Sequence, residues 1–177
     1  MTARAEVLLL GTAPLVRIAA RGLRAHGAGV TPWTLPAGCP AATAAALAAA
    51  ASRAPYWADA AGSPTVISLW TDQDLLDAVA RHVLPGLAPA AQWLQLGPHG
   101  VLRAAGLEAA VRRRGGSAVH AQLNWDLRKG RLYLRCRPRA LLLGSLPALP
   151  VRAWVESLPD LPDPLARRAA RATCPTP

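Results

Sequence analysis

The sequence has no phenylalanine, and its 177 residues include one methionine, three cysteines and ten acidic residues. The cysteines, Cys39, Cys136 and Cys174, lie far apart in no CxxC or Cys/His spacing, so we expect neither a metal site nor a disulfide framework. The longest apolar runs are far shorter than the roughly 20 residues that a membrane span needs. The amino terminus lacks the regions of a signal peptide. These absences together predict a cytoplasmic protein that does not enter a membrane.

Lysine is nearly absent, because Lys129 is the sole lysine among 20 basic residues, and the net charge is +10. Arginine in place of lysine, together with abundant alanine and proline, is typical of a GC-rich genome and needs no binding partner to explain it. The charge still favours attraction to anions such as nucleotides. No helix-turn-helix, aromatic stacking platform or basic stripe accompanies the charge, so nucleic-acid binding is not expected.

The sequence is rich in hydrophobic residues, at 52%, and has only 17% charged residues, which is typical of a chain that buries a core. At 177 residues, one compact domain is the expectation. We expect the domain to span residues 1–158. A proline-rich, basic tail over residues 159–177 is expected to hold a short helix at Leu165–Ala172.

Strand-like and helical segments alternate along the chain. The predicted strands are Glu6–Gly11, Gly29–Trp33, Thr65–Trp70, Gln92–Leu96, Ser117–Leu123, Arg131–Cys136 and Val151–Ser157. The predicted helices are Pro14–His26, Ala41–Arg53, Asp72–Val83 with Thr71 as its N-cap, Val101–Arg114 and Pro138–Leu146. This alternation indicates parallel strands joined by right-handed crossovers. The expected fold class is therefore α/β, a single Rossmann-like domain with a doubly wound, mostly parallel sheet.

The stretch "VLLLGTAPLV", from Val7 to Val16, has the pattern of a nucleotide-binding turn between a strand and a helix. In such a turn the first glycine makes the bend, the second admits the pyrophosphate and the third lets the helix pack on the strand. Gly11 occupies the first place, whereas Ala13 and Val16 occupy the other two. The start of the following helix, at Pro14, still offers N–H groups to an anion.

Three stretches stand in an order and spacing typical of one family: "VLLLGTAPLVRIAARGLRAHGAGVTPW", "PTVISLWTDQDLLDAV" and "GGSAVHAQLNWDLRKGRLYLRC". Together they resemble the N-terminal Rossmann domain of the imine reductase and β-hydroxyacid dehydrogenase superfamily, a 6-phosphogluconate dehydrogenase-like group. The resemblance covers roughly residues 5–158. It implies a site for NAD(H) or NADP(H) at Gly11, Thr12, Ala13, Pro14, Leu15, Thr34, Leu35, Trp70 and Thr71.

The sequence departs from that family at positions that set function. The second strand of a relative ends in an acid for the NAD ribose or in an Asn-Arg type pair for the NADP 2′-phosphate, and here Thr34 and Leu35 stand there. The family's glycine pair is replaced by Asn124 and Trp125. Relatives continue into a helical domain with a catalytic lysine, whereas Lys129 stands in another context. The resemblance therefore implies a degenerate cofactor motif and a face left for a homodimer or a partner protein.

His120, His99 and Asp126 are the candidate catalytic residues. The neutral-range pKa of imidazole suits proton transfer, and Asp126 is placed either to orient His120 or to cap the "LRKG" turn. A structural or surface role is the alternative for both histidines. A ligand pocket is the second candidate site, because indoles at one sheet edge line apolar pockets well, although core filling explains them too. Its expected lining is Trp33, Trp70, Trp93, Trp125 and Asn124.

Three functions remain open. The first is a degenerate Rossmann protein that binds a small molecule in the former cofactor and substrate cleft and catalyses a non-redox step in specialised metabolism, such as cyclisation, isomerisation or elimination. The second is an NAD(P)H-dependent imine or carbonyl reductase completed by a dimer partner or another chain. The third is a non-enzymatic module that binds a partner protein.

Overall fold

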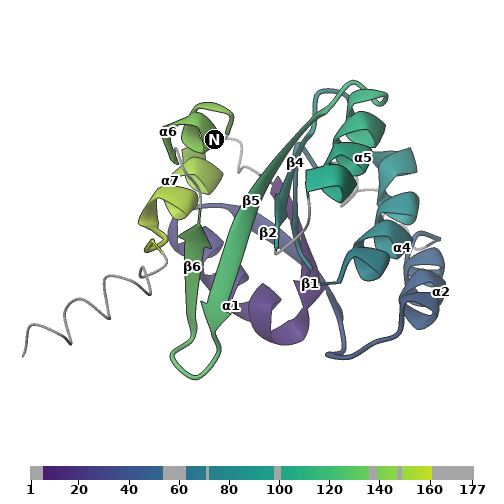
Figure 1. Cartoon of the computed structure of the whole chain (residues 1–177), viewed down its shortest axis with the longest axis horizontal. Helices are drawn as coiled ribbons and strands as arrows, with labels where there is room; N and C mark the ends of the chain where they lie inside the picture. The colour runs from purple at the N-terminus through teal and green to yellow at the C-terminus, as the bar shows by residue number, and fades with distance from the viewer. Residues whose placement is uncertain are drawn as a thin grey trace, which may run out of the picture.

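A six-stranded sheet forms the centre of the molecule, with strand order β2-β1-β3-β4-β5-β6 (Figure 1). The computed structural model describes residues 6–53, 63–70, 72–97, 101–135, 139–146 and 149–160. The tail helix expected at Leu165–Ala172 lies outside them, as do Thr71, His99 and Cys136. The predicted fold class, a Rossmann-like α/β domain with a mostly parallel sheet, is confirmed.

Five strands of the sheet are parallel and joined by helices. In chain order these elements are β1 (Glu6–Thr12), α1 (Ala13–Ala25), β2 (Gly29–Leu35), α2 (Ala41–Ala51), β3 (Thr65–Leu69), α4 (Gln73–Val83), β4 (Gln92–Leu96), α5 (Val101–Arg112) and β5 (Ser117–Asp126). A single 3-10 turn, η1 (Leu84–Gly86), follows α4. Strands β3 and β4 are buried along their whole length, and β1 is buried except at its ends, as is usual for parallel strands that are covered on both faces.

The last strand, β6 (Arg131–Arg135), runs antiparallel to β5. Only Leu127–Gly130 separate the two strands, and a parallel connection needs a crossover of a dozen residues or more. Gly130 takes a positive φ of 58° at the end of this turn, a conformation that favours glycine. The sheet is therefore mostly parallel, as predicted, with one antiparallel pair at this edge.

Two short helices complete the described chain, α6 (Arg139–Gly144) and α7 (Leu149–Ser157). The prediction of a strand at Val151–Ser157 is wrong. Its largest apolar residues, Val151, Trp154 and Val155, recur at helical spacing and are all buried, and Arg152 donates to Glu156 one turn later at 3.2 Å. A strand would have placed Trp154 on the opposite face from Val151 and Val155.

The N-cap of α4 also differs from the prediction. Asp72, not Thr71, holds this position, because its Oδ1 accepts hydrogen bonds from the backbone N–H groups of Asp74 at 2.8 Å and Leu75 at 3.4 Å. An aspartate at this place satisfies two free N–H groups and adds a favourable charge at the helix start.

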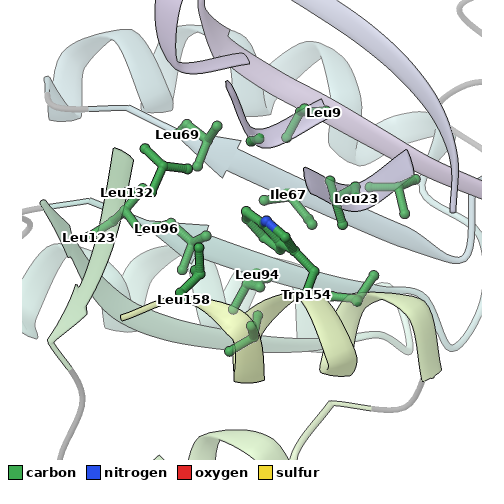
Figure 2. Close-up of a cluster of buried hydrophobic side chains, with 14 of the residues drawn as sticks. Leu9, Leu23, Ile67, Leu69, Leu94, Leu96, Leu123, Leu132, Trp154 and Leu158 are labelled. Carbon is green, nitrogen blue, oxygen red and sulfur yellow. The ribbon is translucent and has the colours of Figure 1, made fainter. Parts of the chain in front are cut away.

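Helices cover both faces of the sheet and enclose two hydrophobic clusters. The α1/α7 cluster joins the odd-numbered residues of β1, Val7 and Leu9, to α1, β6 and α7; Figure 2 shows its centre around Trp154. The α4/α5 cluster joins the even-numbered residues, Leu8 and Leu10, to α2, α4 and α5. Adjacent residues of a strand face opposite sides, so β1 belongs to both clusters.

Candidate functional site

The carboxyl ends of β1 and β3 form the place where an open α/β sheet binds ligands. These two strands are neighbours, but the chain leaves β1 through α1 on one face and β3 through α4 on the other. A crevice is expected where connections diverge in this way. In the register of the sheet, Gly11 lies between Thr34 of β2 and Leu69 of β3.

The start of α1 lies at this edge of the sheet, where the crevice is expected. Thr12 is the N-cap residue, in extended conformation with φ −79° and ψ 146°, and no described side chain caps the helix start. Pro14 occupies the first turn, and that turn holds no acid. Thr12, Ala13 and Pro14 are half-buried and Leu15 is buried. Backbone N–H groups and the positive end of the helix dipole therefore remain for a negatively charged group.

Gly11 and Val16 pack against each other beneath this turn. A Cβ atom on Gly11 would lie 3.0 Å from Val16 Cγ2 and 3.0 Å from Leu69 Cβ, which is closer than side chains normally allow. Val16 is 2% exposed and belongs to the α1/α7 cluster. The valine in place of a third glycine is thus accommodated because Gly11 has no side chain, and Gly11 is required for packing whether or not a cofactor binds.

The end of β2 carries neither kind of ribose-recognising side chain. Thr34 is exposed and Leu35 is buried in the α4/α5 cluster. A buried leucine supplies no hydrogen bond to a ribose and no charge to a 2′-phosphate. This part of the crevice gives no basis for discrimination between NAD and NADP.

The four indoles predicted to line one pocket lie on opposite faces of the sheet, and that prediction is wrong. Trp33 and Trp70 meet edge to face with ring centroids 6.4 Å apart, and Trp93 is fully buried in the same α4/α5 cluster. Trp125 packs against the α1/α7 cluster. Because residues of a strand alternate between faces, Trp125 also points away from its neighbour Asn124. The edge-to-face pair of Trp33 and Trp70 is what remains at the crevice.

A row of polar side chains crosses the α4/α5 side of the sheet. Ser68, Gln95 and His120 are register neighbours on β3, β4 and β5. Trp93 Nε1 donates to Ser68 Oγ at 2.7 Å, and Ser68 Oγ donates in turn to Gln95 Oε1. Ser68 is fully buried and Gln95 is 2% exposed.

Three buried side-chain nitrogens near this row have no hydrogen-bond partner among the described residues: Gln95 Nε2, Asn124 Nδ2 and Trp70 Nε1. Buried donors are normally paired. The sequence analysis missed Ser68 and Gln95. The feature that indicates them is the presence of polar residues in two adjacent buried strands, "TVISL" and "QWLQL".

The structure does not bring the candidate catalytic residues together. His120 and Asp126 both lie in β5, six positions apart along the strand, which places them about 20 Å from each other. Asp126 Oδ1 instead accepts from the backbone N–H of Lys129 at 3.1 Å, so Asp126 caps the turn into β6 and does not orient His120. His99 lies outside the described residues.

His120 is biased toward its neutral form. Burial lowers the pKa of His120 below its ordinary value of 6.5, and a hydrogen bond with the Gly97 backbone opposes that shift in part. A neutral imidazole at physiological pH is able to accept a proton. His120 lies beside Gln95 of β4, two strands beyond β3 in the order of the sheet.

The described part of the chain holds no group of three or more histidine, cysteine or acidic side chains placed to bind a metal ion. In the same residues, none of the helices has the length and apolar character needed to span a membrane.

Comparison with known proteins gives matches among solved structures. No protein-family model matches the chain, and no curated protein sequence matches it. The structure of Mycobacterium tuberculosis 3-hydroxyisobutyrate dehydrogenase with L-serine matches with a TM-score of 0.61 and 17% identity, over 90% of this chain and 54% of that chain. A Bacillus cereus imine reductase matches with a TM-score of 0.57 and 17% identity, over 89% of this chain and 53% of that one.

A Myxococcus stipitatus imine reductase in complex with NADP+ matches with a TM-score of 0.53 and 17% identity, over 77% of this chain and 51% of that chain. The chain thus spans about half the length of these three structures. At identities this low, the structural matches establish the fold alone. The chain has the Rossmann fold found in these dehydrogenases and imine reductases, as its sequence resemblance predicts.

Proposed function

We propose that the crevice between β1 and β3 binds a small phosphate-bearing ligand, through the start of α1 and without selection at the ribose. The observation that carries the proposal is the first turn of α1, which has no side-chain cap and no acid and lies at the carboxyl edge of the sheet. NADH and NADPH are the natural probes, since a Myxococcus stipitatus imine reductase of similar fold is described with NADP+.

Three features support weak binding without selection between NADH and NADPH. The backbone N–H groups of α1 recognise phosphate and not ribose. Thr34 and Leu35 supply neither a carboxylate nor a guanidinium. The methyl group of Ala13 narrows the space through which a phosphate approaches the start of α1, compared with a glycine at this position, and so favours weak binding. We therefore expect NADH and NADPH to bind with similar, weak affinities.

The test is a titration with NADH and with NADPH, followed by energy transfer from tryptophan to the reduced nicotinamide. The expected result is binding of both, with dissociation constants within about threefold of each other, since no charged side chain distinguishes the 2′-phosphate. A preference of about tenfold or more for either cofactor would overturn the proposal. Failure of both to bind at millimolar concentration would also overturn it.

Ala13→Asp tests the position of the phosphate. A carboxylate at the first residue of α1 stabilises the helix start through the dipole but repels a phosphate at the same place. The expected result is loss of dinucleotide binding without loss of stability. Ala13→Asn is the matched control, because it has the same shape without the charge and should retain more of the binding.

A second candidate function is NAD(P)H-dependent reduction of an imine or carbonyl, completed by a second copy of the chain or by another protein. The fold shared with imine reductases and 3-hydroxyisobutyrate dehydrogenases favours it. Its test is NADPH oxidation in the presence of a cyclic imine, with and without cell extract. A non-redox catalytic step is not part of the proposal, because His120 and Asp126 do not form an acid–base pair.

A further inference from the structure

A second concave site lies on the α1/α7 side of the sheet, away from the crevice between β1 and β3. It is an open groove of about 550 Å³ between α1, the turn before β6 and the end of α7. A groove of this size falls within the roughly 300–1,000 Å³ range of small-molecule sites. Its lining residues are Ile18, Arg21, Gly22, Ala25, Gly130, Arg131, Leu132, Trp154, Ser157, Leu158 and Pro159.

The floor of the groove is apolar and belongs to the hydrophobic core. Leu132, Trp154 and Leu158 come from the α1/α7 cluster, and Ile18 packs against it. Figure 2 shows the Trp154 indole projecting from α7 toward the centre of this cluster. A Cβ atom on Gly22 would lie 2.6 Å from Trp154 Nε1, so the indole occupies the space that a side chain at Gly22 would fill. This floor is therefore rigidly positioned by α1 and α7.

The groove carries positive charge. Arg21 of α1 and Arg131 of β6 are exposed lining residues on different elements, and no acid is among the described residues that line the groove. Gly130 directly precedes Arg131 in the sequence, and Arg21 Nη2 lies 3.8 Å from the position that a Cβ atom on Gly130 would take. The Arg21 guanidinium group therefore lies close to the backbone beside Arg131.

Two nearby acids are engaged elsewhere. Glu156 accepts a hydrogen bond from Arg152 at 3.2 Å, and Asp126 lies 3.8 Å from Lys129 Nζ. The groove thus combines an apolar floor with two guanidinium groups that lack a lining counter-charge. An amphipathic anion complements both properties, because guanidinium groups pair with carboxylates and an aliphatic body gains from burial on the floor.

We propose that this groove binds an amphipathic monocarboxylate, with the carboxylate at Arg21 and Arg131 and the aliphatic body over Ile18, Leu132 and Trp154. The site is separate from the crevice of the proposed function and does not depend on it.

Octanoate is the probe, and titration calorimetry measures its affinity while ¹H–¹⁵N spectra follow the six tryptophan side-chain N–H groups. The Trp154 resonance is assigned from its disappearance in Trp154→Phe. The expected result is saturable binding that moves the Trp154 resonance. Arg21→Gln and Arg131→Gln should each weaken binding by about threefold to fivefold, the range for exposed ion pairs. The double variant should weaken it by about tenfold.

Arg113→Gln is the matched control, because Arg113 is an exposed arginine beyond the end of α5 and does not line the groove. It should leave the affinity unchanged. Ala25→Trp, at an exposed lining position on α1, should block binding by filling the groove. Equal binding of octanol, or shifts confined to the other indoles, would overturn the proposal. Dimer formation in light scattering that competes with octanoate would overturn it in favour of a second copy of the chain.

Discussion

At the scale of single residues, Gly11 occupies the first glycine position of a nucleotide-binding motif, and its lack of a side chain also serves the packing of the core. A side chain at Gly11 would meet Leu69 Cβ and Val16 Cγ2, both at 3.0 Å. We expect Gly11→Ala to lower the free energy of unfolding by about 1–3 kcal/mol, the usual cost of overpacking a core. Chemical denaturation measures this change.

The contact with Val16 gives that prediction a control. In a Val16→Ala background the Cγ2 contact is gone, so Gly11→Ala should cost at least about 0.5 kcal/mol less than in the wild type. Gly106→Ala is the matched variant in open space, since nothing lies within 4 Å of a Cβ there, and it should stabilise α5 by up to about 1 kcal/mol. Equal costs for Gly11→Ala in both backgrounds would show that Leu69 alone causes the strain.

His120 gives a pH-dependent contribution to stability. Because burial lowers the pKa of His120 below 6.5 in the folded protein, the unfolded chain binds more protons as the pH falls through that value. The contribution of His120 to the free energy of unfolding is therefore present at higher pH and is lost as the pH falls. His120→Gln should lose less unfolding free energy than the wild type between about pH 8 and about pH 5.

Urea denaturation at several pH values measures this difference. Gln122→Ala, a neighbour on β5 that faces the same side of the sheet and does not titrate, should keep the wild-type slope. Parallel loss of stability in the wild type and His120→Gln would show that other groups cause the acid effect.

At the scale of elements, local patterns were sufficient for most strands and helices but failed where two patterns coexist. The stretch "VRAWVES" has β-type residues that suit a strand, yet Val151, Trp154 and Val155 follow helical spacing and form the buried side of α7. Tertiary packing decides between the two, because Trp154 fits the space beside Gly22 of α1. That fit joins residues 132 positions apart and is not visible in either local pattern.

The fit between Gly22 and Trp154 predicts that the effect of Gly22→Ala on stability changes sign when the Trp154 side chain is removed. In the wild type, Gly22→Ala forces the indole to move, since a Cβ would lie 2.6 Å from Nε1, and should destabilise by about 1–3 kcal/mol. With Trp154→Ala, which itself should cost about 3–5 kcal/mol, the same change becomes an ordinary glycine to alanine substitution in a helix. It should then stabilise by about 0.5–1 kcal/mol. Stability of the four variants by denaturation gives the cycle, and a cost of Gly22→Ala that persists without Trp154 would contradict it.

At the scale of the whole molecule, the sequence was sufficient to predict the parallel sheet and the first turn but not the arrangement of the site. The alternation of strands and helices predicts the mostly parallel sheet, and one motif predicts the Gly11 turn. The separation of Trp93 from Trp125 depends on which face of the sheet each residue takes, and that of His120 from Asp126 depends on the continuation of β5 as far as Asp126. A shift of one residue reverses that face, so position along the chain alone does not group side chains into a pocket.

The two hydrophobic clusters take alternate residues from the same three strands, β1, β3 and β4, and this common use of the strands predicts cooperative unfolding. Leu8 and Leu9 are adjacent, fully buried and members of different clusters, so loss of either cluster exposes the same strands. Val151→Ala, in α7, should lower the free energy of unfolding by about 1–2 kcal/mol from the methyl groups removed. This loss of stability should also extend to the α4/α5 cluster on the opposite face of the sheet.

The measurement uses Trp125→Phe with Trp154→Phe as the common background, which removes the two indoles of the α1/α7 side and leaves the buried indoles Trp70 and Trp93 to report on the α4/α5 cluster. Val151→Ala should shift the denaturation midpoints of their fluorescence and of far-ultraviolet circular dichroism by the same amount, because one transition disrupts both faces. A shift in circular dichroism with no shift in fluorescence would mean that α7 unfolds separately. In that case the groove of Arg21 and Arg131 would open before the edge of the sheet at the carboxyl ends of β1 and β3.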